Sequence, residues 1–246
     1  MSCQKCNPQE LAIEFTMAFQ PIVNFAGKHV WGYETLVRGL NNEPAGFILG
    51  KIDDDNVHSF DQTIRSKAIK LAHSLNFSEK LSINFLPNAV YKPENCIQST
   101  LAVCDELGFD TQRIMFEVTE AEKITDHTHL KNIFQEYKKH NFLTAIDDFG
   151  AGYSGLNLLA EWQPDVIKLD MNLIRDIHEN KTKQLIVKSI LSVCDGLGIS
   201  VISEGVESKN ELLQLVDFGI NLFQGFYFAK PLFEGLPEVK DSTFLT

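Results

Sequence analysis

Two adjacent aspartates, Asp147 and Asp148, are the residues of this chain best placed to do chemistry. They follow an apolar run, residues 142–146, that is typical of a buried strand, and a glycine-rich stretch, residues 149–155, comes directly after them. Neighbouring carboxylates repel each other and resist burial, so a fold that keeps two of them at a strand end usually has a cation there. The pair therefore predicts a cation site.

Polar residues also end most of the other predicted strands. In chain order, the full set is Glu34, Asn84, Glu117, Asp147, Asp148, Lys168, Glu204 and Gln224. Each one alone could be a solvated strand residue, a turn former, a salt-bridge partner or a loop cap. Together, carboxylate and amide oxygens form the ligand set preferred by Mg²⁺ or Mn²⁺, and the lack of His and Cys among them disfavours zinc.

Such a site suits chemistry at phosphorus. Asp147 and Asp148 can bridge two ions, and two ions about 3.5 to 4 Å apart activate a water and stabilise the leaving oxygen of an in-line displacement. Lys168, surrounded by acids, should stay protonated. We expect it to orient the attacking water or to offset phosphate charge.

The strands that position these residues can be read from the hydrophobic pattern. Residues 17–23 and 30–37, joined by a short loop, predict a hairpin. Further strand-like runs lie at residues 81–85, 114–118, 142–146, 166–169, 200–202, 220–223 and 226–228, and helix-like stretches at 60–75, 95–107, 129–140, 156–161, 183–197 and 209–218. Asp61 is a candidate cap for the first helix. This alternation predicts a parallel sheet, and its length favours one closed barrel with functional groups at the carboxyl ends of the strands.

Composition narrows the function classes. The 246 residues include 22 basic and 33 acidic ones, and the net charge of −11 disfavours binding to long nucleic acid. A small phosphate ester is still allowed, because bound metal ions can reverse the field of an acidic pocket. No apolar run approaches the roughly 18 residues of a spanning helix, and no signal-peptide pattern opens the chain, so we expect no membrane insertion and a cytoplasmic location.

Eight motifs of this chain, taken in order, resemble one known family. They are residues 19–23 (FQPIV), 33–39 (YETLVRG), 83–84 (IN), 116–120 (FEVTE), 146–154 (IDDFGAGYS), 166–170 (VIKLD), 203–207 (SEGVE) and 224–226 (QGF). The match runs from about residue 19 to residue 231 and resembles the EAL-domain cyclic di-GMP phosphodiesterases.

The resemblance implies an α/β fold, a TIM-like (β/α)8 barrel with an antiparallel first strand, over residues 17–246 behind an N-terminal segment of residues 1–16. It implies hydrolysis of 3′,5′-cyclic di-GMP to linear 5′-pGpG with two divalent cations, Mg²⁺ or Mn²⁺, which lowers the level of this second messenger in bacterial signalling. It also implies a homodimer and, if the chain is a fragment, a sensor domain or partner elsewhere.

The resemblance also assigns roles, residue by residue. Glu34, Asn84, Glu117 and Asp147 match the ligands of one metal, and Asp147, Asp148 and Glu204 match those of the other. Lys168, Glu204 and Glu120 match catalytic positions, with Lys168 contacting the nucleophilic water and Glu120 holding the loop after Asp148. Gln20, Leu36, Arg38 and Gln224 match substrate contacts, and Glu207 matches an acid behind the ligands.

The chain departs from the family pattern at its name-giving triplet, which reads Glu34-Thr35-Leu36. Because side chains alternate along a strand, Thr35 should point away from the mouth, and we expect the change to be tolerated. Asn84 is followed by Phe85, whereas many members have a small residue there.

Several other interpretations stay open at this point. The glycines at 150, 152 and 155 fit a dinucleotide fingerprint, and residues 148–150 mimic a kinase metal motif, but neither has its usual companions. Cys3 with Cys6, and His127 with His129, each look like half a metal site. The main rival is a catalytically silent EAL-like module that binds cyclic di-GMP or a partner protein as a regulator.

Overall fold

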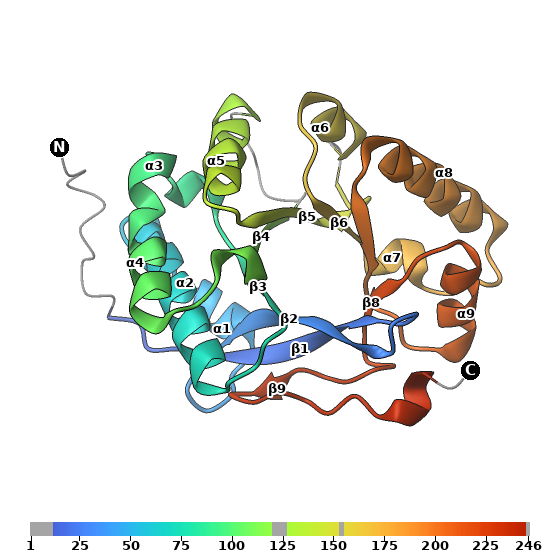
Figure 1. Cartoon of the computed structure of the whole chain (residues 1–246), viewed down its shortest axis with the longest axis horizontal. Coiled ribbons are helices and arrows are strands. Elements are labelled where there is room, and N and C mark those ends of the chain that lie inside the picture. Colours follow the sequence, from blue (N-terminus) through green and yellow to red (C-terminus); the bar gives the residue numbers. More distant parts are fainter. Residues whose placement is uncertain (1–11, 120–126, 153–154, 245–246) are drawn as a thin grey trace.

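The computed structural model describes residues 12–119, 127–152 and 155–244, and within them the strands form one sheet closed into a barrel (Figure 1). The barrel strands are β1 (Thr16–Asn24), β2 (His29–Arg38), β3 (Lys80–Asn84), β4 (Ile114–Thr119), β5 (Leu143–Phe149), β6 (Val166–Leu169), β7 (Ser200–Ser203) and β8 (Leu222–Gln224). They follow one another around the ring in chain order, and β1 closes it between β8 and β2.

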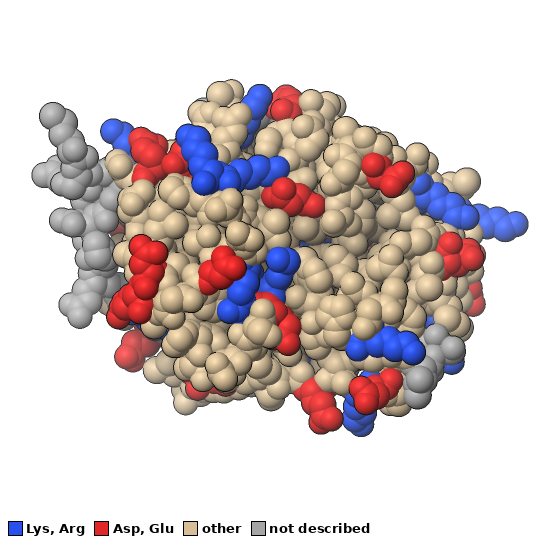
Figure 2. Space-filling view, viewed as in Figure 1, with Lys and Arg blue, Asp and Glu red and all other residues tan. Residues whose placement is uncertain are grey.

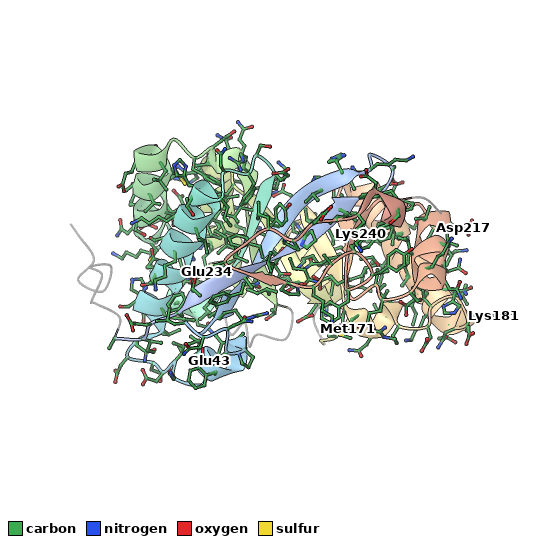
Figure 3. The ribbon with its side chains drawn as sticks, turned by 90° about the horizontal axis from the view of Figure 1, so that it is seen from below. Glu43, Met171, Lys181, Asp217, Glu234 and Lys240 are labelled. Atoms are coloured by element: carbon green, nitrogen blue, oxygen red, sulfur yellow. The ribbon has the colours of Figure 1, made fainter. Side chains whose placement is uncertain are left out.

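The first strand runs against its neighbours. β1 pairs antiparallel with both β2 and β8, whereas the pairs from β2 through β8 are parallel. The predicted TIM-like barrel with an antiparallel first strand is therefore confirmed. A short strand, β9 (Leu232–Phe233), also pairs with β1, and beside it the Thr16 hydroxyl donates to Glu234 Oε1 over 2.5 Å (Figure 3).

In Figure 1, helices lie to the left of the strands, above them and to their right, and β9 lies below them. The helices are α1 (Ala45–Leu49), α2 (Val57–Ser74), α3 (Pro93–Cys96), α4 (Gln98–Leu107), α5 (His127–Lys139), α6 (Gly155–Glu161), α7 (Met171–Ile174), α8 (Lys181–Leu197) and α9 (Lys209–Asp217), with 3-10 turns at Pro87–Ala89, Thr111–Arg113 and Asp241–Phe244. No helix among the described residues is long and apolar enough to cross a membrane. On the face seen in Figure 2, acidic and basic side chains are interspersed and form no broad basic field.

Two apolar layers hold the barrel together. A small cluster of Ile22, Met115, Ala145, Val166 and Ile202 joins residues of five strands. A much larger buried cluster lies between the strands and the helices. Because side chains alternate along a strand, β6 sends Val166 and Lys168 to the inside and Ile167 and Leu169 toward the helices. The same alternation aims the functional residues at the barrel mouth.

Two local predictions were wrong. Residues 226–228 form a turn rather than a strand, because the amide of Phe228 donates back to Gly225 O over 3.1 Å. Asp61 does not cap its helix, since α2 already begins at Val57 and Asp61 is buried inside it, paired with Arg65.

Candidate functional site

One polar residue from each of the eight barrel strands contributes to a single connected layer at the mouth. The residues are Gln20, Glu34, Asn84, Glu117, Asp147, Lys168, Glu204 and Gln224, with Glu204 directly following β7. Hydrogen bonds or ion pairs link every member to at least one other. The structure thus brings together the strand-end residues that the sequence singled out.

The ammonium of Lys168 lies at the centre of this layer and is fully buried. Its Nζ atom is 2.6 Å from Glu204 Oε1, 2.9 Å from Glu117 Oε2, 3.2 Å from Asp147 Oδ1 and 3.3 Å from Glu34 Oε2. Burial alone would lower the pKa of a lysine, but the surrounding carboxylates outweigh it and raise the pKa of Lys168. Lys168 is therefore protonated.

Glu34 is oriented from three sides. Besides the contact with Lys168, its carboxylate accepts from Asn84 Nδ2 over 3.0 Å and from Gln224 Nε2 over 2.6 Å. Gln224 Nε2 also lies 3.3 Å from Gln20 Oε1, and Gln20 donates in turn to the backbone of Ala229. The side-chain amides of Asn84 and Gln224 thus fix the orientation of the Glu34 carboxylate next to Lys168.

A bulge explains how two successive residues of one strand reach the same site. The register between β5 and β6 shifts between Ile146 and Phe149, and Asp148 has a φ of 53°, in the left-handed region. The Asp148 amide donates to Asp147 Oδ1 over 2.9 Å. A regular strand would send the two side chains to opposite faces.

The carboxylates form two groups that each have the spacing of metal ligands. The first carboxylate set is Glu34, Glu117 and Asp147, and the second is Asp147, Asp148 and Glu204; within each set the ligand atoms lie within 4.8 Å of one another. Their five carboxylates and the Lys168 ammonium leave a formal charge of −4, which two divalent cations would balance. Glu117 Oε1 is buried and has no hydrogen-bond partner in the described part of the chain. This donor set fits hard divalent cations such as Mg²⁺ or Mn²⁺.

Without a metal, three of these acids, Glu117, Asp148 and Glu204, have raised pKa values. Burial, with repulsion from Asp147 and other acids, raises the pKa of Glu117 to about 8 and that of Asp148 to about 6. Burial also raises the pKa of Glu204 well above its ordinary value, although Lys168 opposes the shift. Perturbed carboxylates of this kind mark functional sites.

The other predicted site residues lie around this layer or outside the described residues. Leu36 and Arg38 are half-buried on β2, at two-residue steps from Glu34, and Arg38 Nη1 donates to Val37 O over 2.8 Å. Glu207 pairs with Arg175 over 2.8 Å on an exposed loop. Glu120 lies outside the described residues.

Both half metal sites include residues outside the described part of the structure. Cys3 and Cys6 fall outside the described residues, as does the side chain of His127. His129 Nε2 lies 2.5 Å from the carbonyl oxygen of Val90. Among the described residues, the only groups with metal-ligand spacing are the two carboxylate sets.

The sequence reasoning missed Glu211. Its buried carboxylate accepts from the backbone amides of Asp176, Glu207 and Ser208, each over 3.0 Å, and it completes a capping box with Ser208 at the start of α9. This fixes the loop that follows Glu204. The spacing S-x-x-E at residues 208–211 was the available signal.

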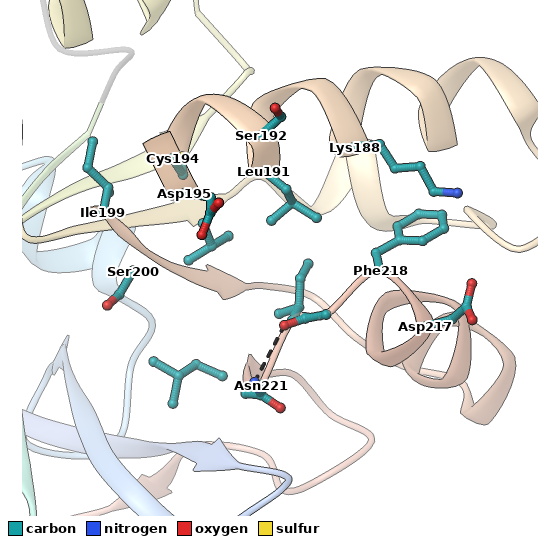
Figure 4. Close-up of a pocket in the computed structure, with 14 residues that line it drawn as sticks. Lys188, Leu191, Ser192, Cys194, Asp195, Ile199, Ser200, Asp217, Phe218 and Asn221 are labelled. Carbon is teal, nitrogen blue, oxygen red and sulfur yellow. Dashed lines mark hydrogen bonds between the residues drawn. The ribbon is translucent and has the colours of Figure 1, made fainter. Parts of the chain in front are cut away.

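A groove of about 660 Å³ lies at the opposite end of the barrel (Figure 4). It is formed where β7 and β8 begin and where α8 and α9 end, and Lys188, Asp195, Asp217 and Asn221 are among its polar residues. Neither carboxylate set contributes to it. The groove is therefore separate from the candidate site at the mouth.

Comparison with known proteins agrees with this geometry. Residues 8–231 match the model of the EAL domain. Among solved structures, a standalone versatile EAL protein from Vibrio cholerae O395, in its c-di-GMP bound form, is 52% identical with a TM-score of 0.92, covering 95% of this chain and 99% of that one. Klebsiella pneumoniae BlrP1, in a manganese/cy-diGMP complex, is 37% identical with a TM-score of 0.87, covering 94% of this chain and 60% of that one.

Two curated relatives from Escherichia coli (strain K12) differ in their described roles. The blue light- and temperature-regulated antirepressor BluF is 31% identical over 90% of this chain, which spans 55% of BluF. The cyclic di-GMP phosphodiesterase PdeR is 41% identical over 53% of this chain and 20% of PdeR. The chain thus spans about half or less of the length of these two relatives. With the family model matching most of its length, the chain belongs to the EAL-domain family.

Proposed function

We propose that this chain hydrolyses 3′,5′-cyclic di-GMP to linear 5′-pGpG with two divalent cations, Mg²⁺ or Mn²⁺, and so lowers the level of this second messenger. The observation that carries the proposal is the pair of carboxylate sets that share Asp147. A shared carboxylate is what a site for two adjacent ions requires. The c-di-GMP bound relative from Vibrio cholerae and the manganese complex of BlrP1 support the choice of ligand and metal.

The two cations would be held by two overlapping groups of residues. Glu34, Asn84, Glu117 and Asp147 would hold one cation, and Asp147, Asp148 and Glu204 the other. When bound, the cations supply an activated water and stabilise the leaving oxygen. The water oxygen would form a new bond to phosphorus and give up a proton, the bond from phosphorus to the 3′ oxygen would break, and that 3′ oxygen would take up a proton.

The protein positions the reacting groups. Lys168, which is protonated, can donate a hydrogen bond to the attacking oxygen from the centre of the layer. Arg38 offers a guanidinium to a phosphate. Gln20, Leu36 and Gln224 are proposed substrate contacts, and Glu120 and Glu207 are proposed to support the loops that carry Asp148 and Glu204.

A direct assay tests the proposal. Purified protein is incubated with cyclic di-GMP and Mg²⁺ or Mn²⁺, and the products are separated by chromatography. We expect linear 5′-pGpG from the parent protein and no product from Glu34→Ala or Asp147→Ala. The matched control is Thr35→Ala, since Thr35 lies next to Glu34 but its hydroxyl donates to Ser82 O over 2.8 Å, away from the acids. Ample turnover by Glu34→Ala would refute the ligand assignment.

The alternative is a regulator that binds cyclic di-GMP, or a partner protein, without turnover. Its support is the relative BluF, which is named as an antirepressor. The same assay separates the two functions, because a silent module retains cyclic di-GMP in equilibrium dialysis but yields no product with either metal.

We also propose that the chain forms a homodimer through an apolar surface on α6 and α8. Leu156, Leu185, Ile186 and Val193 are between 40% and 69% exposed there, and they line a groove of about 660 Å³. Phe149, Gly150 and Gly152, which follow Asp148, line the same groove. Leu185, Ser189, Val193 and Leu197 recur every four residues on one helix face, and such a stripe can pack against its own copy about a two-fold axis. A cytoplasmic location remains a prediction.

A further inference from the structure

A buried ion pair lies behind two of the proposed metal ligands, on the outer side of the barrel wall. Asp61 and Arg65, one turn apart on α2, are 1% and 0% exposed, and their charged groups approach to 2.8 Å. Arg65 Nη1 also donates to the hydroxyl of Tyr137, a fully buried residue of α5, over 2.7 Å. We call these three residues the Asp61–Arg65–Tyr137 unit.

This unit contacts the residues that follow Asn84 and the residue that precedes Glu117. Asp61 Oδ1 accepts from the backbone amide of Leu86 over 3.0 Å, two residues after Asn84. The Arg65 guanidinium lies 5.5 Å from the ring centre of Phe85, which follows Asn84, and 4.8 Å from that of Phe116, which precedes Glu117. Because side chains alternate along a strand, these rings lie behind Asn84 and Glu117.

The segment after Asn84 is held to α2 at a second point as well. His58 Nδ1 lies 2.6 Å from the carbonyl oxygen of Ala89, so α2 contacts both ends of the segment from Leu86 to Ala89. The amide of Phe85 donates to Glu117 O over 3.0 Å and joins the segment to β4. A shift of Asp61 would therefore be passed from Leu86 to Asn84 through one intervening residue, Phe85.

Stability alone does not account for these charges. Removing two charges from water is costly, and a buried ion pair can often be replaced by apolar side chains of similar volume without loss of stability. An acceptor aimed at one particular amide and a planar cation beside two rings instead fix positions. The geometry points to a role in placing the ligands.

We propose that the Asp61–Arg65–Tyr137 unit is a positioning unit that holds Asn84 and Glu117 in place for the cation of the first carboxylate set. This inference rests on the proposed function, since it takes Asn84 and Glu117 to be metal ligands. Asp61, Arg65 and Tyr137 act through Leu86, Phe85 and Phe116 and do not touch substrate.

Two double variants isolate the hydrogen bond to Leu86. Asp61→Asn/Arg65→Met and Asp61→Leu/Arg65→Met both remove the buried charges, but only the first keeps an oxygen that can accept from the Leu86 amide. The probe is Mn²⁺ alone, titrated by calorimetry into each protein, so that the readout does not depend on turnover. Val187→Ala, a buried change on α8, serves as the control for general loss of packing.

We expect Asp61→Leu/Arg65→Met to bind Mn²⁺ about tenfold more weakly than Asp61→Asn/Arg65→Met, as is typical when groups that orient metal ligands are lost. Val187→Ala should bind as the parent does. Equal Mn²⁺ affinity in the two double variants, with both proteins folded by circular dichroism, would overturn the positioning role. A parent protein that binds no Mn²⁺ would instead refute the proposed function on which the inference rests.

Discussion

Lys168 is the residue on which the charge balance of the mouth depends. Without metal, its ammonium is the only cation within 3.3 Å of Glu34, Glu117, Asp147 and Glu204 among the described residues. Leaving buried charges without their partner usually costs about 3–5 kcal/mol. Lys168 thus acts as an internal counterion in addition to its proposed part in catalysis.

We therefore expect Lys168→Met to lower the free energy of unfolding by about 3 kcal/mol in EDTA. Mn²⁺ should restore most of this loss, because the cations replace the missing positive charge. Urea unfolding followed by circular dichroism, with and without Mn²⁺, measures both values. An equal loss of stability in the two conditions would mean that Lys168 contributes packing and not charge.

Asp148 gives a pH-dependent prediction. Burial and Asp147 raise its pKa to about 6, so in the metal-free protein ionised Asp148 disfavours the folded state. Above pH 6, the folded state is destabilised by the full amount. As the pH falls through 6, Asp148 becomes protonated in the folded state, and the lost stability is regained by the time the pH reaches the lower pKa of the unfolded chain. Asp148→Asn, which suits the left-handed backbone, removes this effect.

In EDTA, Asp148→Asn should unfold with a higher free energy than the parent at pH 8, and the difference should shrink steadily from pH 7 to pH 5. Urea titrations at each pH give the two curves. A difference that stays constant over this range would show that Asp148 is not destabilised by its neighbours.

The residue types at the mouth could be predicted from the sequence, but their mutual contacts could not. Alternation along a strand is enough to set Glu34, Leu36 and Arg38 on one face. It would send Asp148 away from Asp147, and only the bulge in β5 brings both to the same site. The four contacts of Lys168 depend on ring closure, which no local pattern encodes.

Two buried acids each hold a segment next to a proposed metal ligand. Asp61 of α2 holds the segment after β3, and Glu211 of α9 holds the loop after β7. Hydrophobic periodicity predicted most barrel strands and several helices, because both follow from burial of one face. The same periodicity wrongly predicted a strand at residues 226–228, where apolar residues instead form a turn. The prediction that Asp61 caps its helix was also wrong, because Asp61 is buried inside α2.

Glu211 gives a prediction at this scale. Its carboxylate satisfies three backbone amides, so Glu211→Ala should lower the free energy of unfolding by about 3 kcal/mol and weaken Mn²⁺ binding through the loop that carries Glu204. Lys209→Ala, an exposed change in the same helix turn, should stay within about 0.5 kcal/mol of the parent. Urea unfolding and Mn²⁺ calorimetry test the pair, and unchanged Mn²⁺ affinity in Glu211→Ala would separate the capping box from the site.

For the whole molecule, the proposed dimer would connect the oligomeric state of the chain with cation binding at Asp148. The groove beside the apolar surface on α6 and α8 is also lined by Phe149, Gly150 and Gly152, which follow Asp148 of the second carboxylate set. A partner packed on this surface would restrict the backbone after Asp148. We therefore expect dimer formation to strengthen binding of the cation that Asp148 is proposed to hold.

Leu185→Glu/Val193→Glu places charges on the α8 stripe and should convert a dimer into a folded monomer, because two like charges would face their copies across the interface. Sedimentation equilibrium measures the mass of the assembly. Mn²⁺ calorimetry measures the coupling to Asp148, and we expect the second Mn²⁺ ion to bind more weakly to the monomer than to the dimer. Leu213→Glu on α9, where the leucine is 41% exposed against 40% for Val193, is the matched control and should leave both unchanged. A monomeric parent protein would refute the interface, whereas a monomeric variant with unchanged Mn²⁺ binding would keep the interface and refute only its coupling to the site.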